Sequence, residues 1–310
     1  MIYRAYGRLI ESEIDLPAGE ASGRADLRLA LGDVLSSENG WTNVWEPTER
    51  APWVRVRREG PDYTIRYERQ VDFHYSPDDR AILTVVHDCP SEPLGHFAMD
   101  QVLPLVLSLE ALVLHASAVV IDDVAVACCG AGGCGKSTLA LMLERQGYPI
   151  LADDALLVRC ERGRVVATPS YAGLRFWPDI AALVGRLAPV DQRAARKLRV
   201  SDGLAFHDRP VVLEQLLIVD VRDSTEPSFE PLSVRETVMA LVANSYRLEQ
   251  HDRALLAAEL DRAVGVSANV SGCRFCYPRG QAAWRDIAAA VVAHVRAAAA
   301  SSRRTSPCCR

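Results

Sequence analysis

The stretch Gly130-Ala131-Gly132-Gly133-Cys134-Gly135-Lys136-Ser137 decides the fold. It matches the pattern G-x-x-x-x-G-K-[ST] of a phosphate-binding loop. The small apolar run Val124–Cys129 before it is typical of a buried strand, and the residues from Lys136 to Arg145 after it favour a helix. A strand, a glycine-rich loop and a helix in this order predict a nucleotide site, with Gly130 to Thr138 as its contacts.

The residue types of this loop match the chemistry of a phosphate group. Glycines let successive backbone N–H groups point inward around phosphate oxygens, and the helix offers its positive end to the same anion. Lys136 can reach the β- and γ-phosphates, and the Ser137 hydroxyl can ligate Mg²⁺. A glycine-rich turn without a ligand is the alternative, and the flanking strand and helix disfavour it.

Two neighbouring carboxylates, Asp153 and Asp154, follow the buried run Ile150-Leu151-Ala152. The end of that strand would bring them beside the phosphate site. One carboxylate could hold the metal or its water, and the other could take a proton from an attacking hydroxyl. A solvated turn is the alternative for an acid pair without a phosphate loop.

The segments around the loop predict a mixed order of strands and helices. Residues 96–114 have the apolar spacing of a buried helix. Two strands joined by a tight turn at Asp122-Asp123 follow, and Gly147 and Pro149 end the helix after the loop. Further along the chain we expect strands at 155–159, 164–167 and 211–221, a helix opened by a capping box at Ser233, and helices at 253–264 and 281–300.

The first 95 residues contain short alternating runs separated by turns, which predict an antiparallel sheet with one face in water. The polar segment 36–50 is expected to be a loop. We therefore expect three parts, namely a β-rich region over 1–95 that could bind an acceptor, a catalytic domain over 96–300, and a flexible tail over 301–310.

The nine cysteines are odd in number and follow no secretory signal, so a disulfide framework is not expected. Cys273-x-x-Cys276 has metal-ligand spacing, but a single such pair lacks the second half of a zinc site, and the surrounding residues read better as a strand.

Composition excludes several classes of protein. The chain has 310 residues, of which 49% are hydrophobic and 24% charged, which is too apolar for a disordered protein. Its net charge of −5 disfavours a general nucleic-acid-binding role. The most apolar stretch, 102–121, contains Pro104, Glu110 and His115, so we expect no membrane-spanning helix. We expect a cytoplasmic protein.

Three sequence elements together resemble the catalytic domain of HPr kinase/phosphorylase. They are the run Leu114-His115-Ala116-Ser117-Ala118, the phosphate loop, and Gly147-Tyr148-Pro149-Ile150-Leu151-Ala152-Asp153-Asp154. The likeness extends to the HPr-kinase-like kinases that tailor ribosomal peptides such as lasso peptides, which share a later stretch that reads Gly173-Leu174-Arg175-Phe176-Trp177-Pro178-Asp179 here. It is strong over 112–180 and implies an α/β fold of the HPr kinase and phosphoenolpyruvate carboxykinase type, a mixed sheet flanked by helices.

The resemblance also implies roles for individual residues. Lys136 and Ser137 match the phosphate and Mg²⁺ positions, Asp153 the general base, and Asp154 a carboxylate on the metal side, with the order of the two acids left open. His115 matches the strand histidine near the acids, with a core histidine as the alternative. Arg175 could contact phosphate or substrate, and a surface arginine would explain it equally well. Lys197 could face the transferred phosphoryl group, but a solvated helix face is favoured for it.

These implications lead to an expected activity. We expect an ATP- and Mg²⁺-dependent kinase that phosphorylates a hydroxyl, foremost a serine of a peptide or small protein. A kinase for a polyol or another metabolite, and a nucleotide-binding module without catalysis, are the alternatives. The Glu-containing glycine-rich run of HPr kinases proper is not found, which puts phosphorolysis and docking of HPr in doubt. The sequence does not decide whether the chain forms a homo-oligomer.

Overall fold

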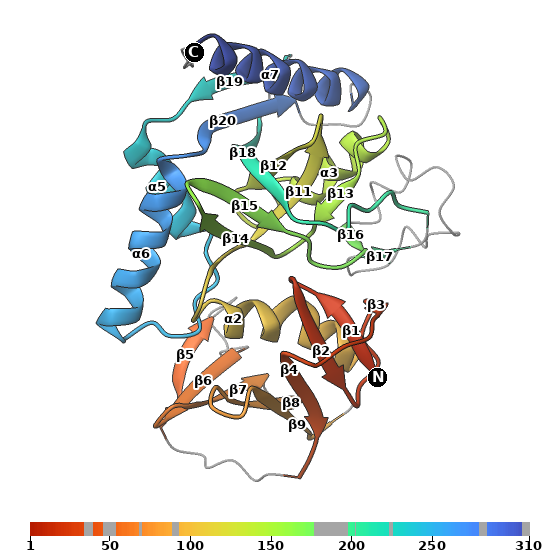
Figure 1. Ribbon diagram of the computed structural model, residues 1–310, viewed down its shortest axis with the longest axis vertical. Coiled ribbons are helices and arrows are strands. Elements are labelled where there is room, and N and C mark those ends of the chain that lie inside the picture. Colours follow the sequence, from red (N-terminus) through yellow and green to blue (C-terminus); the bar gives the residue numbers. More distant parts are fainter. Residues whose placement is uncertain are drawn as a thin grey trace. The chain divides into compact units, whose positions relative to one another are not determined.

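The computed structural model divides into two units, each with its own sheet (Figure 1). Unit 1 comprises Met1–Val113 and Tyr246–Glu259, and unit 2 comprises Leu114–Ser245 and Leu260–Arg310. The structure describes residues 1–33, 40–45, 54–67, 70–88, 93–176, 198–201, 203–222, 226–278 and 284–305.

Unit 1 is rich in strands, as expected, but its sheet is mixed rather than antiparallel. The strands lie in the order β3-β1-β2-β4-β9-β8-β7-β6-β5, and the pairs β2–β4 and β4–β9 are parallel. Parallel neighbours need a crossover connection, and the chain supplies β3 between β2 and β4, and β5 to β8 between β4 and β9. The bounds are β1 Ile2–Ala5, β2 Arg8–Ser12, β3 Gly19–Glu20, β4 Leu27–Leu31, β5 Thr42–Trp45, β6 Val54–Glu59, β7 Asp62–Tyr67, β8 Val71–Ser76 and β9 Ala81–Val86.

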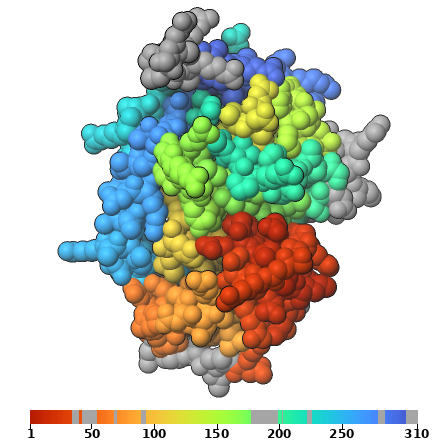
Figure 2. All heavy atoms as spheres, viewed as in Figure 1, coloured from red at the N-terminus to blue at the C-terminus, as the bar shows by residue number. Residues whose placement is uncertain are grey.

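Within unit 1, the red strands β1 to β4 gather on one side and the orange strands β6 to β9 on the other (Figure 2). Strand β5 corrects the expectation of a loop over 36–50, because Thr42–Trp45 pairs antiparallel with β6. Its threonine, valine and tryptophan favour a strand. The parts of that segment at 36–39 and 46–50 lie outside the described residues.

A helical run follows the strands of unit 1 and is shorter than the predicted 96–114. It consists of α1 (Leu94–Phe97), a π-helical turn (Ala98–Val102) and α2 (Leu103–Leu107). Pro104 has no N–H to donate to the Asp100 carbonyl, and the wider π turn lies directly before it. Beyond the run, Leu112–Leu114 forms strand β10, and Val113 O accepts from Tyr246 N at 2.7 Å, so strand-like pairing replaces the last helical turn.

This helical run groups with unit 1, whereas the sequence placed it in the catalytic domain. The Tyr6 hydroxyl donates to Met99 O at 2.8 Å, and the rings of Tyr67 and Phe97 meet edge to face at 5.1 Å. The helices thus cover the apolar side chains of the sheet, which would otherwise face water.

Unit 2 contains a mixed sheet that carries the glycine-rich loop. Its strands follow the order β14-β15-β18-β12-β11-β13, with β20 paired to β18 and β19 to β20. The pairs β12–β18 and β18–β20 are parallel, and the others described are antiparallel. The bounds are β11 Ala116–Ile121, β12 Val124–Cys129, β13 Ile150–Ala152, β14 Leu156–Glu161, β15 Arg164–Thr168, β18 Val211–Arg222, β19 Ser228–Pro231 and β20 Ser271–Pro278, with a separate pair β16 Leu174–Phe176 and β17 Leu198–Val200.

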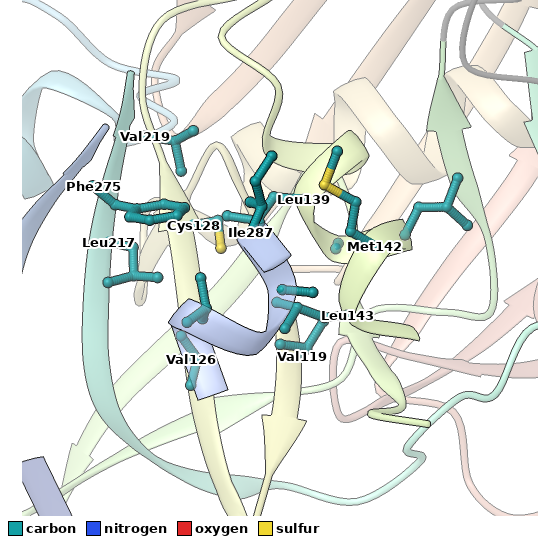
Figure 3. Close-up of a cluster of buried hydrophobic side chains, with 14 of the residues drawn as sticks. Val119, Val126, Cys128, Leu139, Met142, Leu143, Leu217, Val219, Phe275 and Ile287 are labelled. Atoms are coloured by element: carbon teal, nitrogen blue, oxygen red, sulfur yellow. The ribbon is translucent and has the colours of Figure 1, made fainter. Parts of the chain in front are cut away.

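Helices lie on both faces of this sheet, which confirms the predicted α/β class. Helix α3 (Lys136–Glu144) and helix α7 (Trp284–Thr305) share one core with β12, β18 and β20 (Figure 3). Figure 3 shows Phe275 and Leu217 of the sheet close to Ile287 of α7. On the opposite face, a Cβ on Gly272 would meet Thr237 of α5 (Val234–Ala243) at 2.2 Å. Helix α6 spans Arg253–Ser267.

Several local predictions are confirmed in unit 2. Asp122 and Asp123 form the hairpin turn with φ of 48° and 66°, and Ser233 with Glu236 forms the capping box of α5. Gly147 ends α3 with φ of 95°. Helix α7 continues to Thr305, beyond the expected end at 300, because no glycine or proline interrupts its alanine-rich run before Pro307.

The cysteine pair Cys273 and Cys276 lies in strand β20, as expected. Three residues apart in a strand, the two side chains lie on opposite faces of the sheet. Among the residues that the structure describes, no three His, Cys, Asp or Glu side chains are grouped as metal ligands. In the same residues, no helix combines the length and the apolar character needed to cross a membrane.

The shared core of unit 2 predicts a large loss of stability when a buried side chain is truncated. Leu217 of β18 is fully buried, so Leu217→Ala should lower the free energy of unfolding by about 2–5 kcal/mol, measured by urea denaturation. Leu260→Ala on α6 is the matched control, because Leu260 is 48% exposed and should change stability by under about 1 kcal/mol. Equal losses for the two variants would contradict this assignment of the core.

Candidate functional site

The glycine-rich loop joins β12 to α3 through a backbone that only glycine adopts readily. Strand β12 ends at Cys129 and α3 begins at Lys136. Between them Gly130, Gly133 and Gly135 have φ of 141°, 80° and 92°. The loop therefore delivers its backbone to the first turn of α3, where unpaired N–H groups and the helix dipole favour an anion.

At two of these positions, close neighbours also leave no room for a side chain. A Cβ on Gly130 would meet Val219 O at 2.7 Å, and a Cβ on Gly135 would meet the Tyr277 hydroxyl at 2.2 Å. The Tyr277 hydroxyl donates to Gly135 O at 3.3 Å. By contrast, Gly132 and Gly133 have nothing within 4 Å of a built Cβ. The base of the loop, at Gly130 and Gly135, is therefore tightly packed, and its crest, at Gly132 and Gly133, is open.

Lys136 folds back over the loop that precedes it. Its Nζ donates to Gly130 O at 2.8 Å and lies 3.4 Å from Ala131 O, and the residue is only 7% exposed. A buried ammonium needs several acceptors to offset its lost hydration. Here two carbonyls hold the cation at the place where a phosphate oxygen could replace them.

The acid pair lies at the end of β13, as the sequence predicts, and both residues are buried. The Ser117 hydroxyl donates to Asp153 Oδ1 at 2.6 Å, and Arg175 N donates to Asp153 Oδ2 at 2.8 Å. Burial, followed by the neighbouring charge of Asp154, raises the pKa of Asp153 to about 6, against the lowering effect of these donors and of Ser137. Asp153 can therefore exchange a proton near neutral pH.

Asp154 occupies the left-handed region with φ of 60°, an unusual conformation for a residue other than glycine. His115 Nδ1 lies 2.9 Å from Asp154 O, and Arg175 Nη1 lies 3.6 Å from Asp154 Oδ2. Because a carbonyl oxygen only accepts, Nδ1 of His115 carries the proton in this contact. Strained backbone of this kind is concentrated at functional sites.

A pocket brings most of the predicted site residues together. Asp154 lines it, whereas Asp153 lies behind it, bonded to Ser117 and the Arg175 backbone. The lining residues are His115, Gly132, Gly133, Gly135, Lys136, Ser137, Thr138, Asp154, Arg175 and Phe176. The predicted contacts Gly130, Ala131 and Cys134 are outside this lining, and Lys197 and Trp177 to Asp179 lie outside the described residues.

Cys134 belongs to the loop and is half-buried. Burial raises the pKa of its thiol, which disfavours the reactive thiolate. A Cβ on Gly130 would lie 2.8 Å from Cys134 Sγ, so the sulfur fills space against the loop backbone.

Sequence reasoning did not assign roles to Ser117, Phe176, Asn244 or Tyr277. Asn244 Oδ1 accepts from Gly130 N at 2.9 Å, and Asn244 O accepts from His115 N at 2.6 Å. Asn244 therefore ties the glycine-rich loop and the backbone of His115, which lies between β10 and β11, to the end of α5. Ser117 stands in the stretch that carries the family resemblance, which was the only signal for it, and Asn244 and Tyr277 had no local signal at all.

Comparison with known proteins adds little to this geometry. No protein-family model matches the chain, and no curated protein matches it. Among solved structures, the Hpr(Ser) kinase/phosphatase from Coxiella burnetii matches with 12% sequence identity and a TM-score of 0.35. That match covers 62% of this chain and 98% of the other. A likeness this distant carries no argument about activity.

The packing of the loop base predicts unequal costs for two alanine substitutions. Gly133→Ala should lower the free energy of unfolding by about 1–2 kcal/mol, because alanine is strained at positive φ while its Cβ meets no neighbour. Gly135→Ala adds the clash with the Tyr277 hydroxyl, so it should destabilise unit 2 clearly more when unfolding in urea is compared.

The double variant Gly135→Ala/Tyr277→Phe isolates the clash. Loss of the hydroxyl should bring the cost of Gly135→Ala back toward that of Gly133→Ala. If the double variant were no more stable than Gly135→Ala alone, the close approach of Tyr277 would not be the constraint.

The raised pKa of Asp153 predicts a pH dependence of stability. Its carboxyl binds protons more tightly in the folded chain than in the unfolded chain, where the ordinary value is 3.8. The folded state therefore loses stability as pH rises from about 4 to 6. The free energy of unfolding of the wild type, minus that of Asp153→Asn, should fall over this range, and a constant or rising difference would contradict the assignment.

Proposed function

We propose that unit 2 is an ATP-dependent kinase that transfers the γ-phosphoryl group to a hydroxyl. The single observation that carries the proposal is the pocket in which Lys136, Ser137 and the open crest of the loop face Asp154, with Asp153 directly behind. A phosphate cradle alone would support binding. The acid pair beside it supplies the proton acceptor that transfer to an alcohol needs.

The proposed step uses groups of this chain at each point. The acceptor oxygen attacks the γ-phosphorus, the bond from that phosphorus to the β-bridging oxygen breaks, and ADP leaves. The hydroxyl proton passes to the acid pair, and the pKa of Asp153 near 6 suits a base at neutral pH. Lys136 and the loop N–H groups stabilise the charge on the phosphoryl oxygens.

The residues of the pocket also fit a magnesium ion. The Ser137 hydroxyl and the Asp154 carboxylate line the same pocket, and hard oxygen ligands of this kind suit Mg²⁺ bound together with phosphates. The ion, when bound, supplies positive charge to the β- and γ-phosphates. Asp154 is the better candidate for this side because it faces the pocket, whereas both oxygens of Asp153 already accept protein hydrogen bonds.

We propose a serine of a peptide or small protein as the acceptor. This choice rests on the resemblance of the residues around the loop and acid pair to HPr-kinase-like tailoring kinases. A polyol would use the same catalytic groups, because these groups bind phosphate and a proton and do not select the rest of the acceptor.

Phosphoryl transfer from Mg-ATP, followed by mass spectrometry on serine peptides and a polyol panel, tests the proposal. Asp153→Asn should lower the rate by about 100- to 10 000-fold, the usual contribution of a general base. Asp123→Asn is the matched control, because Asp123 lies in the hairpin turn and keeps a residue tolerated at positive φ.

Lys136→Met should lower transfer by about 100-fold or more through lost charge stabilisation. Its matched control is Arg209→Met, because Arg209 is an exposed cation of unit 2 outside the pocket. Transfer only to a polyol would replace the acceptor class and keep the mechanism. ATP binding without transfer, together with unchanged binding in Asp153→Asn, would favour the nucleotide-binding module instead.

A further inference from the structure

A second cavity, of about 300 Å³, lies inside unit 1 between α2 and the strands β1, β2, β4 and β8. It shares no residue with the pocket around the phosphate loop. Its lining is a little more apolar than polar, and its volume lies at the lower end of the range found for ligand-binding sites. The apolar walls include Ala5, Ile10, Leu27, Leu103, Val106 and Leu107.

One polar group in this cavity lacks a partner. Tyr75 is 6% exposed and lines the cavity, and its hydroxyl has no hydrogen bond within the described part of the chain. Burial raises the pKa of this hydroxyl, and the nearby Arg8 and Arg80 act in the opposite direction. The hydroxyl is accessible from the cavity, where it can donate a hydrogen bond to a ligand oxygen.

Two charged side chains of the cavity lining, Arg80 and Asp26, form no ion pair among the described residues. Arg8 pairs with Glu110 at 2.6 Å, and Asp26 Oδ2 accepts from Leu9 N at 2.8 Å. Arg80 also lines the cavity, is exposed, and has no acid within ion-pair distance among the described residues. An apolar cavity with a tyrosine hydroxyl and a free guanidinium fits an apolar group that carries a carboxylate.

The surface beside the cavity favours a peptide as the source of this group. An open trough shares Asp26, Leu27 and Arg80 with the cavity. It continues along Glu11, Arg24, Arg28 and Asp79, a row of both charges that suits the polar main chain and side chains of an extended segment. A small free acid would fill the cavity and leave this trough unused.

We propose that unit 1 binds a peptide that inserts a bulky aliphatic side chain between α2 and the sheet and places a neighbouring carboxylate against Arg80 and the Tyr75 hydroxyl. This site is independent of the nucleotide pocket, so its test needs no ATP and no phosphoryl transfer. It gives unit 1 a binding role that holds whether or not unit 2 is a kinase.

Fluorescence polarisation on the full chain without nucleotide tests the proposal. The probe is the fluorescein-labelled hexapeptide Gly-Ser-Leu-Glu-Ser-Gly. We expect saturable binding that weakens about tenfold or more when Glu is replaced by Gln or Leu by Ser in the peptide. Free 4-methylpentanoate, which has a leucine-like side chain and a carboxylate but no peptide chain, should compete only weakly.

Variants of the protein locate the binding to this cavity. Arg80→Gln and Tyr75→Phe should each weaken the probe about tenfold, and Ala5→Leu, which fills the cavity, should abolish binding. The first matched control is Arg4→Gln, because Arg4 is an exposed arginine of β1 outside the cavity and the trough. The second is Tyr63→Phe, because Tyr63 lies directly across the ladder from Tyr75 and outside the cavity lining. Both controls should bind within about twofold of the wild type, and thermal unfolding checks that every variant is folded.

Three results would overturn the proposal. The first is no binding of the Leu-Glu probe by the folded wild type. The second is that the peptide with Ser in place of Leu binds as tightly as the probe, which would remove the role of the apolar cavity. The third is tight binding of 4-methylpentanoate without binding of the probe, which would make the cavity a site for a free acid.

Discussion

The turn from β12 into α3 is the constraint on which the site in unit 2 depends. Three glycines with positive φ bend the backbone there, and the packing at the base of the turn allows no side chain at Gly130 or Gly135. Val219 and Tyr277 close that base from two parallel neighbours of the sheet, β18 and β20. The core between these strands, α3 and α7 thus fixes a loop whose crest stays open to a ligand.

The acid pair is held by strand β11 of the same sheet and by strand β16 of the separate pair. Ser117 of β11 and the backbone of Arg175 in β16 hold Asp153, while His115 holds the carbonyl of Asp154. Burial and the neighbouring charge of Asp154 disfavour the ionised form of Asp153 and raise its pKa. The fold therefore places the acid pair next to the glycine-rich loop, with Asp154 lining the pocket and Asp153 behind it.

Local patterns in the sequence were sufficient for the parts of the site that are close together in the chain. The loop, the helix after it, the Asp122-Asp123 turn and the Asp153-Asp154 pair all follow from residue types at short spacing. The parallel pairing of β2 with β4 and of β18 with β20, and the bonds from Asn244 and Tyr277 to the loop, join residues far apart in the chain. No spacing rule reports such contacts, and strand β5 was hidden in a segment whose overall polarity suggested a loop.

We propose that the crest of the glycine-rich loop, with Lys136 and Ser137, binds the terminal phosphates of a nucleotide. Calorimetric titration with ATP, ADP and AMP in the presence of Mg²⁺ tests it most directly. Because the pattern of the loop assigns Lys136 to the β- and γ-phosphates, affinity should fall steeply from ATP to AMP. Equal affinity for ATP and AMP, or no binding of any of the three, would contradict it.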